Sequence, residues 1–418
     1  MPSVYSETGR LRKVIVQPPG PALVRVLPSH IHPSSSNYLL YDDLIHVPQA
    51  QVEHRHMTDV LGSVAEVLRF DTLVTDALSS MSCRSKVLER VASLHSVSDA
   101  DLKVLEGAAS SDLTEALIAG GLPGDPRQMF PPIPNLVFTR DLAAIVGKLV
   151  VVGNASMTAR HRESILTWAV VDHHPLFAQS MVSESSRRGV RSSPLTIEGG
   201  DVLVISSSLA CIGASERTSW SMIVNLSQEL VQQGFTRILV VEMPKQRSSM
   251  HLDTVFTMID WDSAVIYRPL MHKGDPEEAN VLRLRAGPDG LVVEDLPGDL
   301  LDALAQEGHP LAPVLCGGGD PIHERREQWT DGANYMALGP GVVMGYARNT
   351  HTARHMEDRG YTVIEPADFL TRMSRDYHDD PEQLFDSGDR YAIHIPGSEL
   401  SRGRGGPRCL TLPLLRDA

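Results

Sequence analysis

A series of short β-branched runs, each stopped by glycine, proline or asparagine, constrains the fold of this chain more than any other feature. The runs lie at residues 11–20 (LRKVIVQPPG), 143–154, 201–213, 237–244, 264–269, 290–297 and 341–349. Helical stretches separate them, such as 219–234, where Ile223, Leu226 and Leu230 recur at helical spacing ahead of a glycine. Strand runs that alternate with helices predict an α/β protein, and no residue period proves an internal repeat.

Residues 72–122 break this rhythm, because they contain no good strand and carry three short helical segments. Ser98 and Ser111 stand where helix N-caps belong, and Gly120 stands where a helix should end. We therefore expect a single catalytic domain over residues 1–418, with a helical insertion at 72–122.

Composition narrows the class of partner. The 418 residues carry a net charge of -14, which argues against binding of nucleic acid or of anionic membranes. The first twenty residues have no apolar signal region, and no apolar run approaches the length of a membrane span. Cys83, Cys211, Cys316 and Cys409 lack metal-ligand or disulfide spacing. These features predict a soluble cytoplasmic protein that binds a small molecule and needs no metal or other cofactor.

Three motifs place acids or a histidine beside turn residues. In HLD, His251 and Asp253 would project from one face of a strand. In IEGGD, two glycines permit close backbone approach, and a buried Glu198 would have to be paired or protonated. In FTRD, Phe138 and Asp141 share a site only if the strand ends or bulges there. Each motif alone is also compatible with solvated surface side chains.

The fourth motif is a cysteine near the C-terminus. Cys409 follows a glycine-rich stretch that contains Arg402, Arg404 and Arg408, and neighbouring cations lower the pKa of a thiol. The glycines would let this loop bend over a substrate. The same stretch is compatible with a disordered, phosphate-binding end, and Cys316 in VLCGGGDP is the rival nucleophile.

Together these groups suit one kind of substrate. A guanidinium is planar and permanently cationic, so paired carboxylates bind it in a fork and hold its carbon for attack. A thiolate attacks that carbon, and an imidazole protonates the departing ammonia and then deprotonates water.

As an ordered set, the motifs resemble the arginine deiminase family over nearly the whole chain. The matching segments are SETGRLRKVIVQPPG (6–20), LLYDDLI (39–45), PNLVFTRD (134–141), IEGGDV (197–202), ERTS (216–219), HLDTVFT (251–257), REQWTDGAN (326–334), PGVVMGYARNT (340–350) and SRGRGGPRC (401–409). The resemblance implies the pentein fold, a five-bladed α/β propeller of ββαβ pseudo-repeats with a helical insertion. It also implies hydrolysis of free L-arginine to L-citrulline and ammonia through a covalent intermediate on cysteine, and a homo-oligomer, dimer or tetramer.

The resemblance assigns a role to each motif. Cys409 would be the nucleophile and His251 the general acid and base, with Glu198 assisting; Asp141 and Asp253 would grip the guanidinium. The implied substrate contacts are Arg160 and Arg217 with Asn135 at the carboxylate, a backbone carbonyl at Leu39 or Leu40 at the amine, and Phe138, Gly403 and the mobile Arg404 around the substrate.

Some features depart from the family pattern. Tyr41 stands where phenylalanine is usual, the loop near 30–38 is long, and Arg408 stands where some members have histidine.

Three other functions remain open. An agmatine deiminase would not need Arg160 and Arg217, whereas an amidinotransferase stays compatible with the sequence. A silent binding module would have lost a member of the catalytic set, and every member is present.

Overall fold

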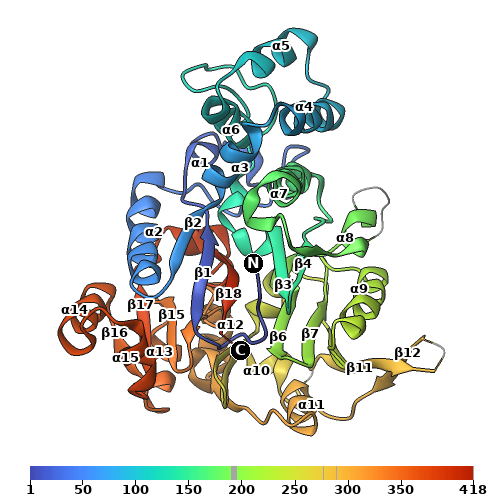
Figure 1. Cartoon of the computed structure of the whole chain (residues 1–418). Helices are drawn as coiled ribbons and strands as arrows, with labels where there is room; N and C mark the ends of the chain where they lie inside the picture. The colour runs from blue at the N-terminus through green and yellow to red at the C-terminus, as the bar shows by residue number, and fades with distance from the viewer. Residues whose placement is uncertain (190–194, 276, 289, 418) are drawn as a thin grey trace.

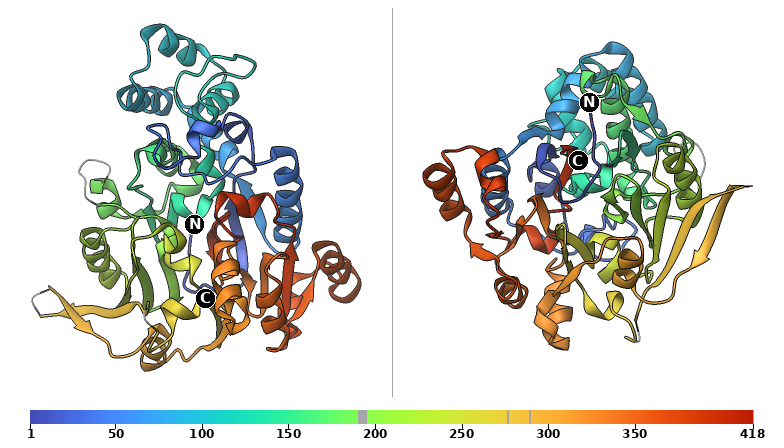
Figure 2. Two further views of the ribbon diagram at one scale, coloured as in Figure 1. Left: turned by 180° about the vertical axis from the view of Figure 1, so that it is seen from behind. Right: turned by 60° about the horizontal axis from the view of Figure 1, so that its bottom comes forward.

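The computed structural model describes residues 1–189, 195–275, 277–288 and 290–417, and their strands form five separate sheets (Figures 1 and 2). One unit shows the pattern clearly. Strands β6 (Val202–Ser206) and β7 (Leu209–Ala214) form an antiparallel pair, helix α9 (Trp220–Gln232) follows, and β8 (Arg237–Glu242) then joins β7 in parallel. The Ser219 side chain accepts a hydrogen bond from Met222 N, which caps α9 as the sequence pattern requires.

Each of the other four sheets likewise contains an antiparallel pair of strands and a further strand that joins this pair in parallel. Their strands are β3 (Ala143–Val146), β4 (Leu149–Val152) and β5 (Met181–Val182); β9 (Phe256–Asp260), β10 (Ser263–Ile266) and β13 (Ala312–Leu315); β14 (Met336–Gly339), β15 (Val342–Tyr346) and β17 (Tyr391–Ile395), with β16 (Thr362–Ile364) at the edge; and β18 (Thr411–Arg416), β1 (Leu11–Val16) and β2 (Glu66–Arg69).

The pairing of β1 with β18 brings the two ends of the chain into one sheet. Helices connect the antiparallel pairs to the parallel strands, and the hairpin of β11 (Asn280–Gly287) and β12 (Gly290–Asp295) extends the sheet of β8. The main connecting helices are α2 (Val47–Gly62), α7 (His161–His173), α11 (Leu300–Gln306), α13 (Thr350–Glu357) and α14 (Pro366–Tyr377). The other helices outside residues 70–119 are α1 (Pro21–Val24), α8 (Glu184–Gly189), α10 (Arg268–Met271), α12 (Pro321–Trp329) and α15 (Pro381–Asp386) among the described residues.

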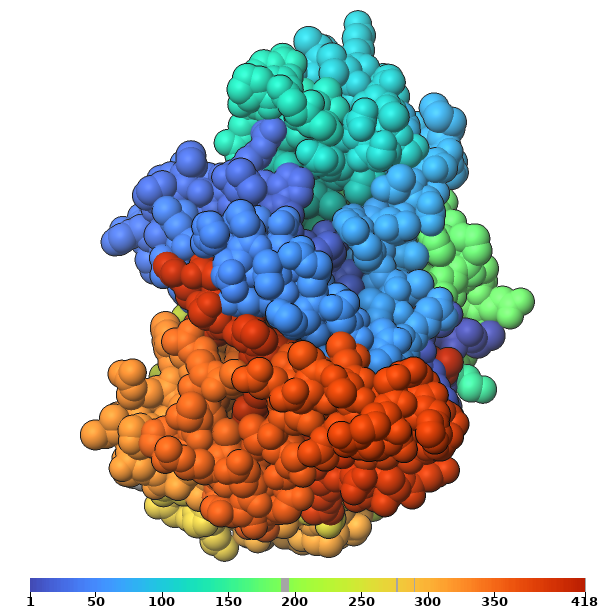
Figure 3. Space-filling model, turned by 90° about the vertical axis from the view of Figure 1, so that its left-hand side faces the viewer, coloured from blue at the N-terminus to red at the C-terminus, as the bar shows by residue number. Residues whose placement is uncertain are grey.

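A group of four helices stands at one end of the molecule, at the top of Figures 1 and 3. They are α3 (Phe70–Leu78), α4 (Met81–His95), α5 (Asp99–Gly107) and α6 (Ser110–Ala119). The Ser98 side chain caps α5, and Gly120 ends α6 with a φ of 90°, both as predicted. The predicted cap at Ser111 is wrong, because α6 already begins at Ser110.

The predicted catalytic motifs occupy the same place in successive sheets. The short 3₁₀ turns η3 (Thr139–Leu142) and η6 (Gly199–Asp201) lead directly into β3 and β6. One residue separates the turn η8 (Leu252–Thr254) from β9. Asn334 precedes β14, and Cys409 precedes β18. Residues far apart in the sequence therefore enter their sheets from equivalent positions and meet.

The strand predicted for the HLD motif is wrong, because His251 precedes a 3₁₀ turn and β9 begins only at Phe256. The cause is a distant partner: Leu252 N donates to Asp201 Oδ1 at 2.9 Å instead of to a neighbouring strand. Among the helices of the described residues, none is long and apolar enough to span a membrane.

Candidate active site

One small cavity brings the predicted thiol, imidazole and carboxylate together. Its volume is about 10 Å³, close to the space of a single water molecule. The residues that line it are Leu40, Asn135, Phe138, Asp141, Arg160, Arg217, Arg247, Met250, His251, Thr254, Gly403, Arg404 and Cys409. Phe138 and Asp141 share the cavity because residues 134–142 form two 3₁₀ turns, which meets the condition that the sequence set for them.

His251 lies between two acids. Its Nε2 is 2.9 Å from Glu198 Oε2, and its Nδ1 is 3.7 Å from Asp141 Oδ1. Burial disfavours the imidazolium, but Asp141 and Glu198 outweigh it and raise the pKa of His251 to about 9. The imidazole is therefore protonated at neutral pH, the state in which it can donate a proton.

Glu198 is buried and ionised. Burial alone would raise the pKa of Glu198, but Arg160 and Arg217 hold it well below its usual range. Arg160 Nη1 lies 3.1 Å from Glu198 Oε2, and Arg217 Nη1 lies 3.5 Å from the same oxygen. The expected pairing of a buried Glu198 is thus confirmed.

The guanidinium of Arg160 occupies the acid cluster. Its Nη1 donates to Asp141 Oδ2 at 2.6 Å, and its Nη2 lies 2.8 Å from Glu163 Oε2. The guanidinium of Arg160 therefore fills part of the position that the sequence analysis assigned to the guanidinium of a substrate. Two carboxylate oxygens, Asp141 Oδ1 and Glu198 Oε1, remain without a donor among the described residues.

Cys409 lies beside Asp253. Its Sγ is 3.8 Å from Asp253 Oδ2, and this carboxylate accepts a hydrogen bond from Arg408 Nη1 at 2.6 Å. Arg408 also donates to Glu7 Oε2, from Nε at 3.1 Å and from Nη2 at 3.0 Å. Arg408 thus links the N-terminal segment to the acid next to the thiol.

The predicted lowering of the Cys409 pKa by nearby arginines is present for Arg408, but the predicted net direction is wrong. Burial first, and then Asp253 and Asp141, raise the pKa of this thiol well above its usual value, and the lowering by Arg408 does not offset them. Arg408 is itself paired with Asp253 and Glu7. Arg402 pairs with Asp43 and Glu399, and Arg404 stacks 3.8 Å from the ring centroid of Trp329.

The solvated-surface interpretations are wrong as well. His251, Asp253 and Glu198 are each at most 2% exposed. Residues 403–414 are buried and end in β18, which contradicts a disordered tail. Cys316 lies in η9 (Cys316–Gly319), where burial raises the pKa of its thiol, and it lies outside the wall of the catalytic cavity.

The glycines of IEGGD permit the close approach that the sequence suggested. A Cβ on Gly199 would meet Arg140 O at 2.1 Å, and one on Gly200 would meet His251 Nδ1 at 2.7 Å. A larger residue at position 200 would push the imidazole of His251 away, and one at position 199 would push against the backbone carbonyls of Arg140 and Ala143.

Three side chains of the site have the composition of a metal site. Ligand atoms of Asp141, Glu198 and His251 all lie within 4.8 Å of one another. The Arg160 guanidinium lies against two of them, so a metal ion there would face a positive charge of the chain. These three side chains are therefore suited to a cationic group of the chain or of a substrate.

Comparison with known proteins agrees with this geometry. A family model described as arginine deiminase matches residues 123–378 and 383–416. The chain belongs to the arginine deiminase family. An arginine deiminase from Latilactobacillus sakei is 32% identical over 440 residues, covering 99% of this chain and 98% of the relative. One from Mycobacterium bovis is 33% identical over 437 residues, with the same coverage.

Solved structures share the fold. An amidinotransferase of saxitoxin biosynthesis from Microseira wollei has a TM-score of 0.52 and 12% identity, covering 100% of this chain and 98% of that one. The N-terminal domain of ArgZ, an arginine dihydrolase from cyanobacteria, has a TM-score of 0.50 and 12% identity, covering 97% of each chain. These likenesses show that this member of the arginine deiminase family has the mixed α/β pentein fold.

Sequence reasoning missed two residues that support the site of this arginine deiminase homologue. Asn334 Oδ1 accepts a hydrogen bond from Cys409 N at 3.0 Å, and its Nδ2 donates to Asp253 O at 2.9 Å. Glu7 holds Arg408, as described above. Both lie inside segments that carried the family resemblance, but their partners are distant in sequence and no local pattern names them.

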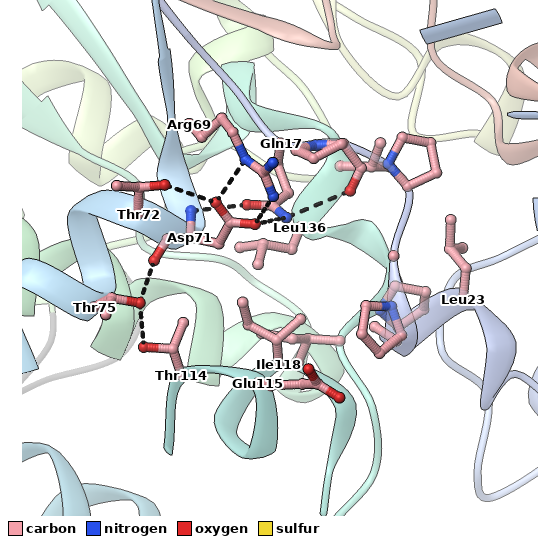
Figure 4. Close-up of a pocket in the computed structure, with 18 of the residues that line it drawn as sticks. Gln17, Leu23, Arg69, Asp71, Thr72, Thr75, Thr114, Glu115, Ile118 and Leu136 are labelled. Atoms are coloured by element: carbon pink, nitrogen blue, oxygen red, sulfur yellow. Dashed lines mark hydrogen bonds and ion pairs between the residues drawn. The ribbon is translucent and has the colours of Figure 1, made fainter. Parts of the chain in front are cut away.

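A second cavity, of about 460 Å³, is lined by residues from 17–23, 69–75, 111–118 and 133–137 (Figure 4). Its polar side chains bond to one another: Thr75 to Thr114 at 2.9 Å, and Arg69 to Asp71 at 2.7 Å. Its wall holds neither the thiol nor the imidazole of the family motifs, so the small cavity is the candidate active site.

Proposed function

We propose that the protein hydrolyses free L-arginine to L-citrulline and ammonia, with Cys409 as nucleophile. The observation that carries the proposal is the single cavity shared by Cys409, His251 and Asp141, with the Glu198 and Asp253 side chains beside it. Membership of the arginine deiminase family supports the same reaction.

Substrate binding begins with an exchange of cations. The guanidinium of the substrate displaces Arg160 from Asp141 and binds between Asp141 and Asp253. The open acceptor Asp141 Oδ1 then gains an N–H donor, which removes the cost of leaving it unpaired in the interior. Once displaced, Arg160 joins Arg217 and Asn135 at the substrate carboxylate, while Leu40, Phe138, Gly403 and Arg404 enclose the rest of the ligand.

The thiol becomes a nucleophile only when this cation is present. Arginine's positive charge beside Sγ stabilises the thiolate and offsets the burial that raises the pKa of Cys409, so the thiol releases its proton to solvent as the substrate binds. The thiolate attacks the guanidinium carbon, and a C–S bond forms. Protonated His251 donates its proton to one terminal nitrogen, the C–N bond breaks, and ammonia leaves.

Hydrolysis completes the cycle. Neutral His251 takes a proton from water, the oxygen attacks the carbon of the thiouronium intermediate, and the C–S bond breaks. L-citrulline is released, the thiolate and the imidazolium are restored, and the second proton of the water passes to ammonia. Glu198 stabilises the imidazolium in both steps.

Product analysis tests the assignment. The protein is incubated with L-arginine or agmatine, and citrulline, ammonia and ornithine are measured. We expect citrulline and ammonia from arginine and little turnover of agmatine, because agmatine has no carboxylate for Arg160 and Arg217. Ornithine without ammonia would indicate an amidinotransferase, and no turnover of either compound with Cys409 intact would overturn the enzyme assignment.

We also propose that the chain is a single domain and that its five sheets are the blades of an α/β propeller, with 72–122 as a helical insertion. Support comes from the five equivalent ββαβ units and from the pairing of β1 with β18. One cooperative unfolding transition would agree with a single domain, whereas two separate transitions would contradict it. The family resemblance supports a dimer or tetramer, which light scattering tests. The net charge of -14 argues against a nucleic-acid partner, and the cytoplasmic location expected from the sequence is tested by cell fractionation.

A further inference from the structure

A large cleft adjoins the catalytic cavity and shares part of its wall. The cleft measures about 1070 Å³ and the cavity about 10 Å³, and both are lined by Leu40, Arg217 and Arg247. Arginine has twelve heavy atoms and cannot fit in the space of one water molecule. A substrate that arrives in the cleft therefore reaches Cys409 only after this shared wall moves.

Arg247 holds the wall together. It lies in the turn η7 (Arg247–Ser249), and its Nη2 donates to Leu40 O at 2.9 Å. Nε and Nη2 of the same guanidinium also donate to Asp42 Oδ2, at 3.2 and 2.9 Å. One arginine thus joins η7 to a loop more than 200 residues earlier in the sequence.

Leu40 is strained at this point. Its φ of 60° lies in the left-handed region, which a leucine rarely adopts. Two hydrogen bonds hold the strained segment: Asn135 Nδ2 donates to Leu39 O at 2.5 Å, and Arg247 donates to Leu40 O. A cation of the chain therefore occupies the Leu40 carbonyl.

The turn is also held from its far side. The carbonyls of Arg247 and Ser248 accept hydrogen bonds from Arg404 Nη2, at 3.5 and 3.2 Å. Because Arg404 holds the backbone of η7, separation of the Arg247 side chain from Asp42 and Leu40 does not require the turn itself to move.

We propose that Arg247 is a positioning residue for the arginine hydrolysis proposed above, and that its pairing with Asp42 closes the passage to Cys409. Entry of the substrate separates the pair, which uncovers the Leu40 carbonyl and the Asp42 carboxylate. The family resemblance already implies a backbone carbonyl at Leu39 or Leu40 as an acceptor for the α-amine. The Asp42 carboxylate is the second acceptor that we add, and together they bind the α-ammonium of the substrate, a cation that replaces the guanidinium of Arg247. The pair therefore both gates the cavity and selects substrates with a free α-amine.

The neighbouring residue supplies a matched control. Asp43 accepts a hydrogen bond from Arg402 Nη2 at 2.8 Å, in a more exposed ion pair, and lines neither cavity. Asp42→Asn and Asp43→Asn each remove one negative charge at adjacent positions, but only the first weakens the pair at the mouth. Equal unfolding midpoints of the two variants would show that both are folded.

The first measurement uses no substrate. The full-length protein is treated with iodoacetamide at constant pH, and alkylation of Cys409 is followed by mass spectrometry of its peptide. We expect Asp42→Asn to react about five- to tenfold faster than wild type, since the lost charge-assisted bond corresponds to about that factor, and Asp43→Asn to react at the wild-type rate. Equal rates in all three proteins would overturn the gate.

The second measurement concerns selection of the amine. Turnover of L-arginine is compared with that of 5-guanidinovalerate, which has the guanidinium and the carboxylate but no α-amine. The ratio of kcat/KM for arginine to kcat/KM for 5-guanidinovalerate should be smaller in Asp42→Asn than in wild type, mainly because KM for arginine is higher. Asp43→Asn should have the wild-type ratio. An unchanged preference in Asp42→Asn would overturn the role in selection.

Arg247→Lys keeps the charge but offers a single ammonium for two acceptors. Faster alkylation with partly retained turnover is expected, and wild-type behaviour in both assays would contradict the role of Arg247. Because alkylation is measured without turnover, a protein that shows the gate but hydrolyses no arginine would refute the proposed function and leave the gate in place.

Discussion

Replacing Glu198 by glutamine should lower the pKa of His251 while keeping the shape of the site. The wild-type pKa of about 9 exceeds the ordinary 6.5 because Asp141 and Glu198 stabilise the imidazolium against burial. At about 1.36 kcal/mol per pH unit, this difference corresponds to about 3 kcal/mol in favour of the charged form. Glutamine can still accept the hydrogen bond from Nε2 but carries no charge.

The expected change follows from the two distances. Glu198 Oε2 is the nearer acid at 2.9 Å, and Asp141 Oδ1 remains at 3.7 Å after the substitution. Burial alone would take the pKa of His251 below 6.5, so the loss of one of the two acids should lower it by about one pH unit or more, or about 1.4 kcal/mol.

Nuclear magnetic resonance of the imidazole Cε1–H provides the assay, with His251→Asn used to assign the signal. His394 is an internal control, because it is buried beside Tyr335 and its pKa, lowered by burial to about 4, should not change. A His251 that titrates at or below 6.5 in wild type would refute this electrostatic reasoning. A pKa equal to that of wild type in Glu198→Gln would refute the role of Glu198.

Other predictions concern the nucleophile, the substrate carboxylate and stability. Cys409→Ser should abolish citrulline formation, whereas Cys316→Ser should retain it; comparable losses in both would contradict the choice of nucleophile. Arg217→Ala should raise KM more than it lowers kcat, because it removes binding common to the ground and transition states, and a pure loss of kcat would argue against this role. The raised pKa of His251 contributes stability that is complete below pH 6.5 and is lost as pH rises through about 9. Urea unfolding should therefore show that the wild-type advantage over His251→Asn shrinks across that range, and a growing advantage would contradict the sign.

Local patterns in the sequence predicted the elements whose structure depends on neighbouring residues. The run at 201–213 became β6 and β7, and the helical spacing at 219–234 became α9 with Ser219 as its cap. Both depend on hydrophobic period and capping chemistry, which a short segment contains in full. The common ββαβ order of the five sheets was only hinted at, because it lies in strand pairing and not in a repeated residue pattern.

Electrostatics at the site could not be predicted in this way, because the partners of each charge come from distant segments. Arg402, Arg404 and Arg408 are close to Cys409 in the sequence, yet Asp43, Trp329 and Glu7 draw them into other contacts. The HLD motif lost its strand for the same reason, since Leu252 N donates a hydrogen bond to the distant Asp201. The ordered set of motifs predicted which residues meet, but proximity in sequence did not predict which charges remain free.

The central claim is that the carbon of the substrate guanidinium becomes bound to the sulfur of Cys409. The most direct measurement is to mix the protein with L-arginine, quench in acid within one turnover, and analyse the peptides by mass spectrometry. We predict an adduct on the peptide of Cys409 whose mass equals that of arginine less ammonia. Citrulline formation without any adduct on Cys409, or with the adduct on Cys316, would contradict the account, and an adduct of the amidino group alone would assign the chemistry of a transferase.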